Sequence, residues 1–234
     1  MEVTFDILRR RSAAEKPFIQ TVTIDGGRCA TVAEALDLIN AEELADDPIQ
    51  WERSCKQKKC GACAMLINGR PRLACDTKLS EFRKSRIELA PLKKFPVVRD
   101  LIVDRKVIFD DLQKLGAWLD ENAEADISGI SYEASRCLQC GCCLEVCPNF
   151  YPGGDFYGAS VLSVSSRLAA ETPAEYSKRI YGAYNEHFYR GCGKSLSCKD
   201  ICPAGIDTER LMVNSNAAAV WKRGKRKKTG SKQY

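Results

Sequence analysis

Residues 137–148 read Cys-Leu-Gln-Cys-Gly-Cys-Cys-Leu-Glu-Val-Cys-Pro, and the spacing of their cysteines recurs 55 residues further along the chain. In the first copy the repeated cysteines stand at positions 137, 140, 143 and 147, and Pro148 follows the last of them. The second copy has Cys192, Cys198, Cys202 and Pro203 in the matching places. Ser195 stands where its second cysteine would be. The chain therefore carries one ligand pattern twice, and the second copy lacks one thiol.

This spacing is that of bacterial iron–sulfur ferredoxins, in which the fourth cysteine of each run ligates the other cluster. We therefore expect two interleaved ligand sets. A [4Fe–4S] cluster is predicted on Cys137, Cys140, Cys143 and Cys202. A second cluster is predicted on Cys147, Cys192 and Cys198. Because Ser195 supplies no thiol, [3Fe–4S] is the expected species there, and a serine oxygen that retains a fourth iron is the alternative.

A different cysteine set lies in the first third of the chain. It has the Cys-x4-Cys-x2-Cys spacing with a distant fourth member, and it consists of Cys55, Cys60, Cys63 and Cys75. This is the plant-type spacing for a [2Fe–2S] cluster. The Asn-Gly pair at 68–69 predicts a hairpin that returns Cys75 beside Cys63. The sequence therefore predicts a [2Fe–2S] cluster on these four thiols.

Zinc is the alternative metal for such thiols, since tetrahedral zinc sites also use paired cysteines. Zinc motifs place two cysteine pairs on either side of a loop, whereas the first set has three close thiols and a fourth that returns on a strand. The spacing therefore favours an iron–sulfur cluster over a zinc ion. A zinc-bound scaffold that docks proteins or nucleic acid through a basic tail is the alternative class of function.

The overall composition limits the other possibilities. The chain has 13 cysteines in 234 residues and begins with a charged segment instead of an apolar leader, so we expect metal ligands in a reducing compartment rather than disulfides. No apolar stretch reaches the roughly 20 residues that a membrane helix needs. Cys29 and Cys142 are predicted to be small buried hydrophobic residues. No nucleophile–histidine–acid set occurs, so no catalytic residue is predicted.

Residues 1–97 are predicted to form a small α+β domain. The expected elements are strands at 3–7 and 18–24, a helix from a capping box at Thr31 and Glu34, the hairpin at 68–69 and a strand at 86–89. Two prolines, Pro91 and Pro96, bound the expected linker. The fold class predicted for the whole chain is therefore α+β.

Residues 98–234 are predicted to form a mostly helical domain. Apolar residues recur at helical spacing over 103–119, and Asp207 can cap a last helix. Of the 36 Lys and Arg residues, seven lie in the tail 221–234, which has no acid, so the rest carries 29 bases and 31 acids. The tail is interpreted as a disordered end, with attraction to anionic lipid as the alternative. No pattern for nucleic-acid binding accompanies it.

The order of the three cysteine sets resembles the iron–sulfur subunit of succinate dehydrogenase and fumarate reductase. The resemblance covers nearly the whole chain. Its marks are Cys55-Lys-Gln-Lys-Lys-Cys60-Gly-Ala-Cys63-Ala-Met, the segment from Pro91 to Asp104, Cys137-Leu-Gln-Cys140-Gly-Cys142-Cys143, and both Cys-Pro pairs. The family implies a β-grasp plant-type ferredoxin domain followed by a mostly helical, bacterial-type two-cluster ferredoxin domain.

The same resemblance implies partners and a role. It implies a flavoprotein subunit that carries covalent FAD and interconverts succinate and fumarate, a cytochrome b-type membrane anchor, and a quinone at the anchor interface. The chain would then relay single electrons between them at the cytoplasmic face of the cell membrane, as a peripheral subunit held by the anchor. The direction of the reaction stays open, since it depends on reduction potentials and on the quinone.

In the family, the quinone site is formed in part by residues just after the first Cys-Pro and just after the first cysteine of the three-iron set. The corresponding positions here include Pro148, Asn149, Lys194 and Ser195. The tryptophan often found soon after that Cys-Pro is absent, and Ser195 occupies a usually aliphatic position. Two acceptors therefore stay open. One is a quinone of the menaquinone type held differently, and the other is a soluble or thiol redox partner.

Three lysines crowd the first cysteine loop, Lys56, Lys58 and Lys59. One interpretation is a solvated loop tip. The other is that their positive charge stabilises the reduced cluster and raises its reduction potential.

Overall fold

The computed structural model describes residues 2–12, 14–116, 118, 121, 123–124, 128–173 and 177–221. Contacts between Cα atoms group the chain into two units. The first unit comprises residues 1–105 and 138–145, and the second comprises 106–137 and 146–234. The domain boundary after residue 97 stays a prediction. The first unit includes residues 98–105 and 138–145 in addition to the predicted first domain.

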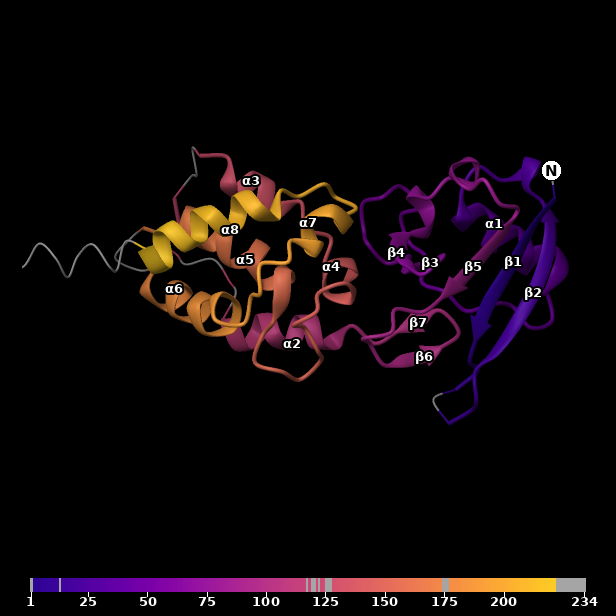
Figure 1. The fold of residues 1–234 in the computed structure, drawn as a ribbon, viewed down its shortest axis with the longest axis horizontal. Coiled ribbons are helices and arrows are strands. Elements are labelled where there is room, and N and C mark those ends of the chain that lie inside the picture. The colour runs from indigo at the N-terminus through magenta and orange to yellow at the C-terminus, as the bar shows by residue number, and fades with distance from the viewer. Residues whose placement is uncertain are drawn as a thin grey trace, which may run out of the picture. The chain divides into compact units, whose positions relative to one another are not determined.

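A mixed five-stranded sheet forms the first unit, with the strand order β2-β1-β5-β3-β4 (Figure 1). Its strands are β1 (Glu2–Arg9), β2 (Phe18–Asp25), β3 (Ala64–Ile67), β4 (Arg70–Leu73) and β5 (Arg86–Ala90). The central pair, β1 and β5, is parallel, and the other neighbours are antiparallel. Along β1, Val3, Phe5 and Ile7 are buried while their neighbours are not, which is the alternation expected of a sheet covered on one face.

Helix α1 (Val32–Leu38) begins where the capping box predicts. The Thr31 hydroxyl accepts a hydrogen bond from the Glu34 amide at 3.2 Å, and the Glu34 carboxylate accepts one from the Ala30 amide at 2.7 Å. The helix continues as a wider π-helical turn, Ile39–Glu43. Its buried residues Val32, Leu36 and Ile39 have almost no exposed surface, so this face belongs to the hydrophobic core of the first unit.

A buried arginine fixes the end of β1. The Arg9 side chain has no exposed surface and donates hydrogen bonds to both oxygens of the equally buried Asp100 carboxylate, at 3.3 and 3.0 Å. It also donates to the Asp47 and Pro48 carbonyls. Asp100 in turn accepts from the amides of Arg10 and Gln50. Every partner of this ion pair is thus satisfied, which is the condition for tolerating buried charges.

The segment from Pro91 to Arg105 packs onto the first unit, because Leu92 and Phe95 are buried there. It contains a short antiparallel pair, β6 (Val97–Arg99) and β7 (Ile102–Val103). The amides of Lys93 and Lys94 both donate to the Glu145 carboxylate at 3.0 Å. Glu145 ends helix α4 (Cys142–Glu145), and these bonds join residues 138–145 to the first unit.

The second unit is helical in its described part. Its helices are α2 (Lys106–Leu115), α3 (Ile130–Ser135), α5 (Gly158–Glu171), α6 (Lys178–Tyr184), α7 (Ser197–Ile201) and α8 (Thr208–Asn216). Two π-helical turns extend α6 and α8, at Asn185–Tyr189 and Ala217–Trp221. Figure 1 shows α3, α5 and α8 gathered around one another. Asp207 caps α8 as predicted, since its carboxylate accepts a hydrogen bond from the Arg210 amide.

The core of the second unit combines aliphatic and aromatic side chains. Its buried members are Ile130, Ala134, Leu162, Tyr184, Phe188, Ile206, Leu211, Met212 and Ala219. Hydroxyl groups within it are paired, since Tyr184 donates to the Asn216 amide oxygen at 2.7 Å and the hydroxyls of Ser166 and Ser215 are 2.8 Å apart. Buried polar atoms of this kind need such partners.

The predicted fold class is confirmed. The chain is α+β, with a mixed sheet in its N-terminal part and a mostly helical C-terminal part. The helix expected over 103–119 is shorter, because α2 covers Lys106–Leu115. Residues 222–234 of the basic tail lie outside the described residues. Among the described helices, none combines the length and apolar character that crossing a membrane requires.

Candidate metal centres

Cys55, Cys60, Cys63 and Cys75, called the loop set below, lie in the first unit. The hairpin of β3 and β4 turns at Asn68 and Gly69, which both have positive φ, as the predicted tight turn requires. This hairpin returns Cys75 to Cys63, and the two sulfur atoms are 3.4 Å apart. The local sequence therefore brings the distant fourth thiol beside Cys63.

Backbone amides in the loop 56–59 point at the sulfur atoms of the loop set. The amides of Gln57 and Lys59 each donate to the Cys55 sulfur at 3.3 Å, and the Lys58 amide donates to the Cys75 sulfur at 3.3 Å. Lys56 and Lys58 adopt positive φ values of 51° and 59°, a conformation that side chains other than glycine rarely take. The backbone thus bends so that consecutive amides face the ligand atoms, like the anion-binding nests of other proteins.

These amides favour a charged sulfur. Hydrogen bonds from the Gln57 and Lys59 amides lower the pKa of the Cys55 thiol to about 7. Burial acts in the opposite direction on Cys63 and raises the pKa of its thiol to about 12. Because metal ligands must be thiolates, iron bound at this site must supply the stabilisation that Cys63 lacks by itself. A donor set of four thiols with three facing amides fits a [2Fe–2S] cluster.

The lysines of this loop are largely paired. Lys56 forms an ion pair with Asp37 of α1, which also pairs with Arg53, and Lys58 pairs with Asp76 at 2.6 Å. Lys59 is exposed and forms no ion pair that the structure describes. The carboxylates therefore offset much of the positive charge that the sequence places beside Cys55 and Cys60, and the fixed amides act at closer range.

Cys137, Cys140, Cys143 and Cys202, called the divided set, are distributed over both units. In the first unit Cys140 is buried, and a hydrogen bond from the fully buried Cys142 thiol lowers the pKa of the Cys140 thiol to about 7. In the second unit, Cys137 and Cys202 both pack against the helical core. Contacts between their neighbours join the two segments, since the Arg136 guanidinium donates to the Ala204 carbonyl.

Cys147, Cys192 and Cys198, called the cavity set, line one cavity of the second unit. Apolar side chains form much of its wall, including Phe156, Phe188 and Met212. Ser195 also lines this cavity. Lys194 and Leu196 on either side of it have φ values of 57°, so a strained loop presents this wall.

The cavity set has a less polar environment than the loop set. Burial raises the pKa of the Cys192 and Cys198 thiols. The Cys198 sulfur lies 3.5 Å from the Thr208 hydroxyl, and the Ser197 hydroxyl donates to Ser195 at 3.3 Å. Three thiols and one hydroxyl around an apolar cavity are a suitable donor set for a cluster with three thiolate ligands.

The four residues predicted to help form a quinone site are only partly gathered in one place. Asn149, Lys194 and Ser195 line the cavity together with the cavity set, whereas Pro148 is exposed and is absent from the lining. The Asn149 side chain donates to the Gly191 carbonyl at 2.6 Å, and the Lys194 ammonium lies over the Tyr189 ring.

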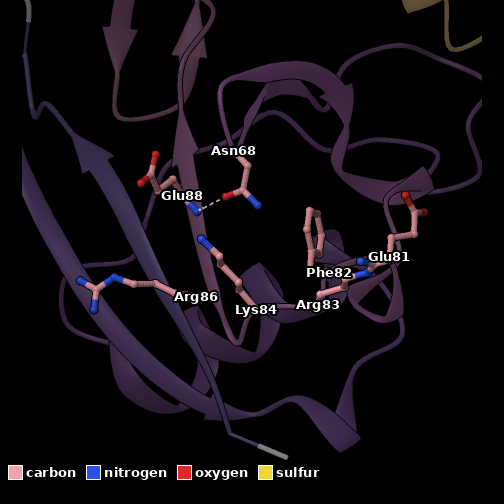
Figure 2. A pocket seen from close by; sticks show the side chains of 7 residues that line it. All are labelled: Asn68, Glu81, Phe82, Arg83, Lys84, Arg86 and Glu88. Atoms are coloured by element: carbon pink, nitrogen blue, oxygen red, sulfur yellow. Dashed lines mark hydrogen bonds between the residues drawn. The ribbon is translucent and has the colours of Figure 1, made fainter.

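The two unassigned cysteines are buried, Cys29 and Cys142. Among the described residues, no three His, Cys, Asp or Glu side chains converge as the ligands of a single metal ion do. A further pocket of about 520 Å³ lies between the hairpin turn and the loop before β5, and no cysteine is among its lining residues (Figure 2). Its lining mixes both charges, and it comprises Asn68, Glu81, Phe82, Arg83, Lys84, Arg86 and Glu88.

Sequence reasoning missed three groups near the thiols. The first is Arg105, whose guanidinium donates to carbonyls of two cysteine loops. The second is the thiol of Cys142, and the third is the carboxylate of Asp37. No local motif marks Arg105 or Asp37, because each acts on a segment far from it in sequence, whereas Cys142 lies two residues from Cys140. A Cys-Cys pair within a ligand run is a signal that could have indicated a thiol donor at position 142.

Two family comparisons agree with this arrangement. A 2Fe-2S iron-sulfur cluster binding domain family matches residues 4–110, and a 4Fe-4S dicluster domain family matches residues 133–206. The first match contains the whole loop set, and the second contains the divided set and the cavity set. The chain therefore consists of one 2Fe–2S and one 4Fe–4S dicluster domain.

Relatives that match most of this chain are iron–sulfur subunits. The chain is 34% identical to the succinate dehydrogenase iron-sulfur subunit of Bacillus subtilis, over 87% of each chain. It is 31% identical to the fumarate reductase iron-sulfur subunit of Wolinella succinogenes, over 88% of this chain and 94% of that one. A chain of the Mycobacterium smegmatis Sdh1 complex shares the fold with a TM-score of 0.75 and 21% identity, over 94% and 96% of the two chains.

Proposed function

Because the chain belongs to the family of succinate dehydrogenase and fumarate reductase iron–sulfur subunits, we propose that it relays single electrons between a flavoprotein subunit and a quinone. Its partner would carry FAD and interconvert succinate and fumarate. The chain itself supplies no catalytic residue in this proposal. Its contribution is to hold clusters that each accept and release one electron when bound.

The observation that carries the proposal is the loop 56–59, where three consecutive amides face the sulfur atoms of Cys55 and Cys75. Fixed amide dipoles stabilise negative charge without reorganising. Such a site suits a centre whose charge changes by one unit while its ligands stay in place. A zinc site undergoes no such change in charge, because zinc is not redox-active.

The ligand assignments follow the three sets. The loop set holds a [2Fe–2S] cluster, the divided set a [4Fe–4S] cluster, and the cavity set a [3Fe–4S] cluster with Ser195 at the fourth corner. Support for the last assignment comes from the three thiols and Ser195 that line one cavity. Support for pairing Cys137 with Cys202 comes from the bond between the neighbouring Arg136 and Ala204.

The quinone end lies at the cavity set in this proposal. Asn149 and Lys194 line the same cavity and offer an amide and a cation to a quinone carbonyl, whereas Pro148 lies outside the lining. The acceptor is a quinone of the menaquinone type at the interface with a cytochrome b-type membrane anchor. The chain is then a peripheral subunit at the cytoplasmic face of the cell membrane.

The test uses the chain copurified anaerobically with its flavoprotein and anchor. Succinate should reduce the clusters, as followed by electron paramagnetic resonance, and a menaquinone analogue should reoxidise them. Cys60→Ala should abolish quinone reduction while leaving succinate oxidation by an artificial dye at the flavin. Cys29→Ala is the matched control, because it removes a buried thiol outside the three sets and should leave both activities.

Two outcomes would contradict parts of the proposal. Clusters that form but exchange no electrons with succinate or fumarate would exclude the succinate/fumarate role. Clusters that succinate reduces but quinone analogues leave reduced would instead favour a soluble or thiol redox partner.

A further inference from the structure

Arg105 is placed between two cysteine loops of the first unit. Its guanidinium donates to the carbonyls of Gly61 and Ala62 at 3.1 and 3.0 Å, within the loop from Cys60 to Cys63. It also donates to the Cys140 carbonyl at 3.3 Å. One side chain thus binds the backbone of a loop-set segment and of a divided-set segment, although they are 79 residues apart at Gly61 and Cys140.

The two loops are in direct contact beside this arginine. Gly61 has a φ of 73°, and a Cβ atom placed on it would lie 2.8 Å from both the Cys140 Cβ atom and the Leu138 carbonyl oxygen. No side chain fits there without displacing backbone. Gly61 therefore permits the close approach, and the three hydrogen bonds from Arg105 tie the same two loops together.

The chemistry of this contact requires arginine. The planar guanidinium carries five N–H donors in a fixed fork, so it can serve three carbonyls at once, whereas a lysine ammonium is a compact point charge. Only 12% of the Arg105 side chain is exposed, and burial lowers its pKa below the usual range of an arginine. Glu52 forms an ion pair with it, which helps to offset the cost of burying the charge.

We propose that Arg105 is a positioning residue that clamps the loop of Cys60 and Cys63 to the loop of Cys140, fixing the separation and the electronic coupling of the centres bound there. The proposal rests on the cluster assignments of the proposed function. The clamp also places a cation beside backbone carbonyls of both loops. Positive charge there stabilises the reduced form of each centre, so the residue also raises both reduction potentials.

The test compares Arg105→Lys and Arg105→Met with the parent chain in the purified complex. Spin–spin interaction between the reduced centres, followed by power saturation of the [2Fe–2S] resonance, reports their separation. Both variants should saturate at several-fold lower power than the parent, because methionine has no N–H donor and the compact lysine ammonium lacks the planar fork that spans the three carbonyls. Midpoint potentials should fall in Arg105→Met and move less in Arg105→Lys, which keeps the charge.

Arg9→Met is the matched control, since Arg9 is a buried arginine of the same unit that contacts no cysteine loop. It should destabilise the unit and leave the saturation behaviour and the potentials of the remaining folded protein unchanged. Iron loss from Arg105→Met, with iron retained in Arg9→Met, would also support the clamp. Parent-like saturation and potentials in both Arg105 variants at full iron content would overturn it. A parent without either resonance would instead refute the proposed function.

Discussion

The loop set and the cavity set hold their sulfur atoms by opposite means. In the loop set, three backbone amides face two sulfur atoms, and the pKa of the Cys55 thiol falls to about 7. In the cavity set, aromatic side chains and methionine surround the thiols, and burial raises the pKa of Cys192 and Cys198. Backbone amides thus favour charge on two sulfur atoms of the loop set, whereas burial disfavours charge on Cys63 and on two thiols of the cavity set.

The largest expected effect is the separate loss of each centre. Cys60→Ala should remove about two iron atoms and the [2Fe–2S] resonance, and Cys198→Ala should remove about three iron atoms and the [3Fe–4S] resonance. Each change should spare the other centre, because the two sets belong to different units. Iron and sulfide analysis with paramagnetic resonance measures this. Loss of both centres from either substitution would mean that the sets are not independent.

The next largest effect is expected from a core substitution beside the cavity set, which should affect that set more than the loop set. Phe188 is 2% exposed, lies 5.3 Å from the Tyr184 ring and lines the cavity of the cavity set. Phe188→Ala should cost about 3–5 kcal/mol of unfolding free energy and weaken the [3Fe–4S] resonance first. Denaturant unfolding followed through cluster absorbance tests this.

Phe109→Ala is the control for that substitution, since Phe109 lies in the same unit and is 58% exposed. It should change stability by no more than about 0.5 kcal/mol. If Phe188→Ala weakened the [2Fe–2S] and [3Fe–4S] resonances equally, apolar packing would not be a support specific to the cavity set.

Replacing Ser195 by cysteine should give the cavity set four thiols, as the divided set has. Ser195→Cys restores the Cys-x2-Cys-x2-Cys spacing, so it should add about one iron atom and convert the [3Fe–4S] cluster to [4Fe–4S]. Mössbauer and paramagnetic resonance spectra measure the change. Ser197→Cys places a thiol two residues away and outside the spacing, so it should leave three iron atoms there. Conversion by both variants, or by neither, would argue against Ser195 as the fourth corner.

The smallest expected effect concerns the lysines of the loop set. Lys59→Gln should lower the [2Fe–2S] midpoint slightly, because an exposed charge is screened by water and salt. The shift should shrink at high ionic strength. Lys84→Gln, on the rim of the pocket in Figure 2, is the control and should have no effect. A large, salt-independent shift for Lys59→Gln would show that side-chain charge outweighs the amides.

Local patterns explain why much of this molecule was predictable. The Asn68-Gly69 turn, the Thr31 cap and the cap of α8 each depend on a few adjacent residues, and the structure has them where the sequence places them. The cysteine spacing likewise indicates which thiols belong together. These features are encoded within a short stretch of chain.

Long-range packing was not predictable in the same way. The segment between Pro91 and Pro96 was expected to be a linker, yet Leu92 and Phe95 are buried and the Lys93 amide binds Glu145. The Arg105 contacts with Gly61 and Cys140 likewise join segments far apart in sequence. Periodicity carries no information on such partners, because it reports only which face of an element is buried.

The central claim is that thiols in two contrasting environments hold redox-active iron–sulfur clusters. The most direct measurement is paramagnetic resonance of anaerobically purified protein, oxidised and then reduced, together with iron and acid-labile sulfide content. We predict about nine iron atoms per chain, a [3Fe–4S] signal in the oxidised protein that disappears on reduction, and a [2Fe–2S] signal that appears. Colourless protein that contains zinc and negligible acid-labile sulfide would contradict the account.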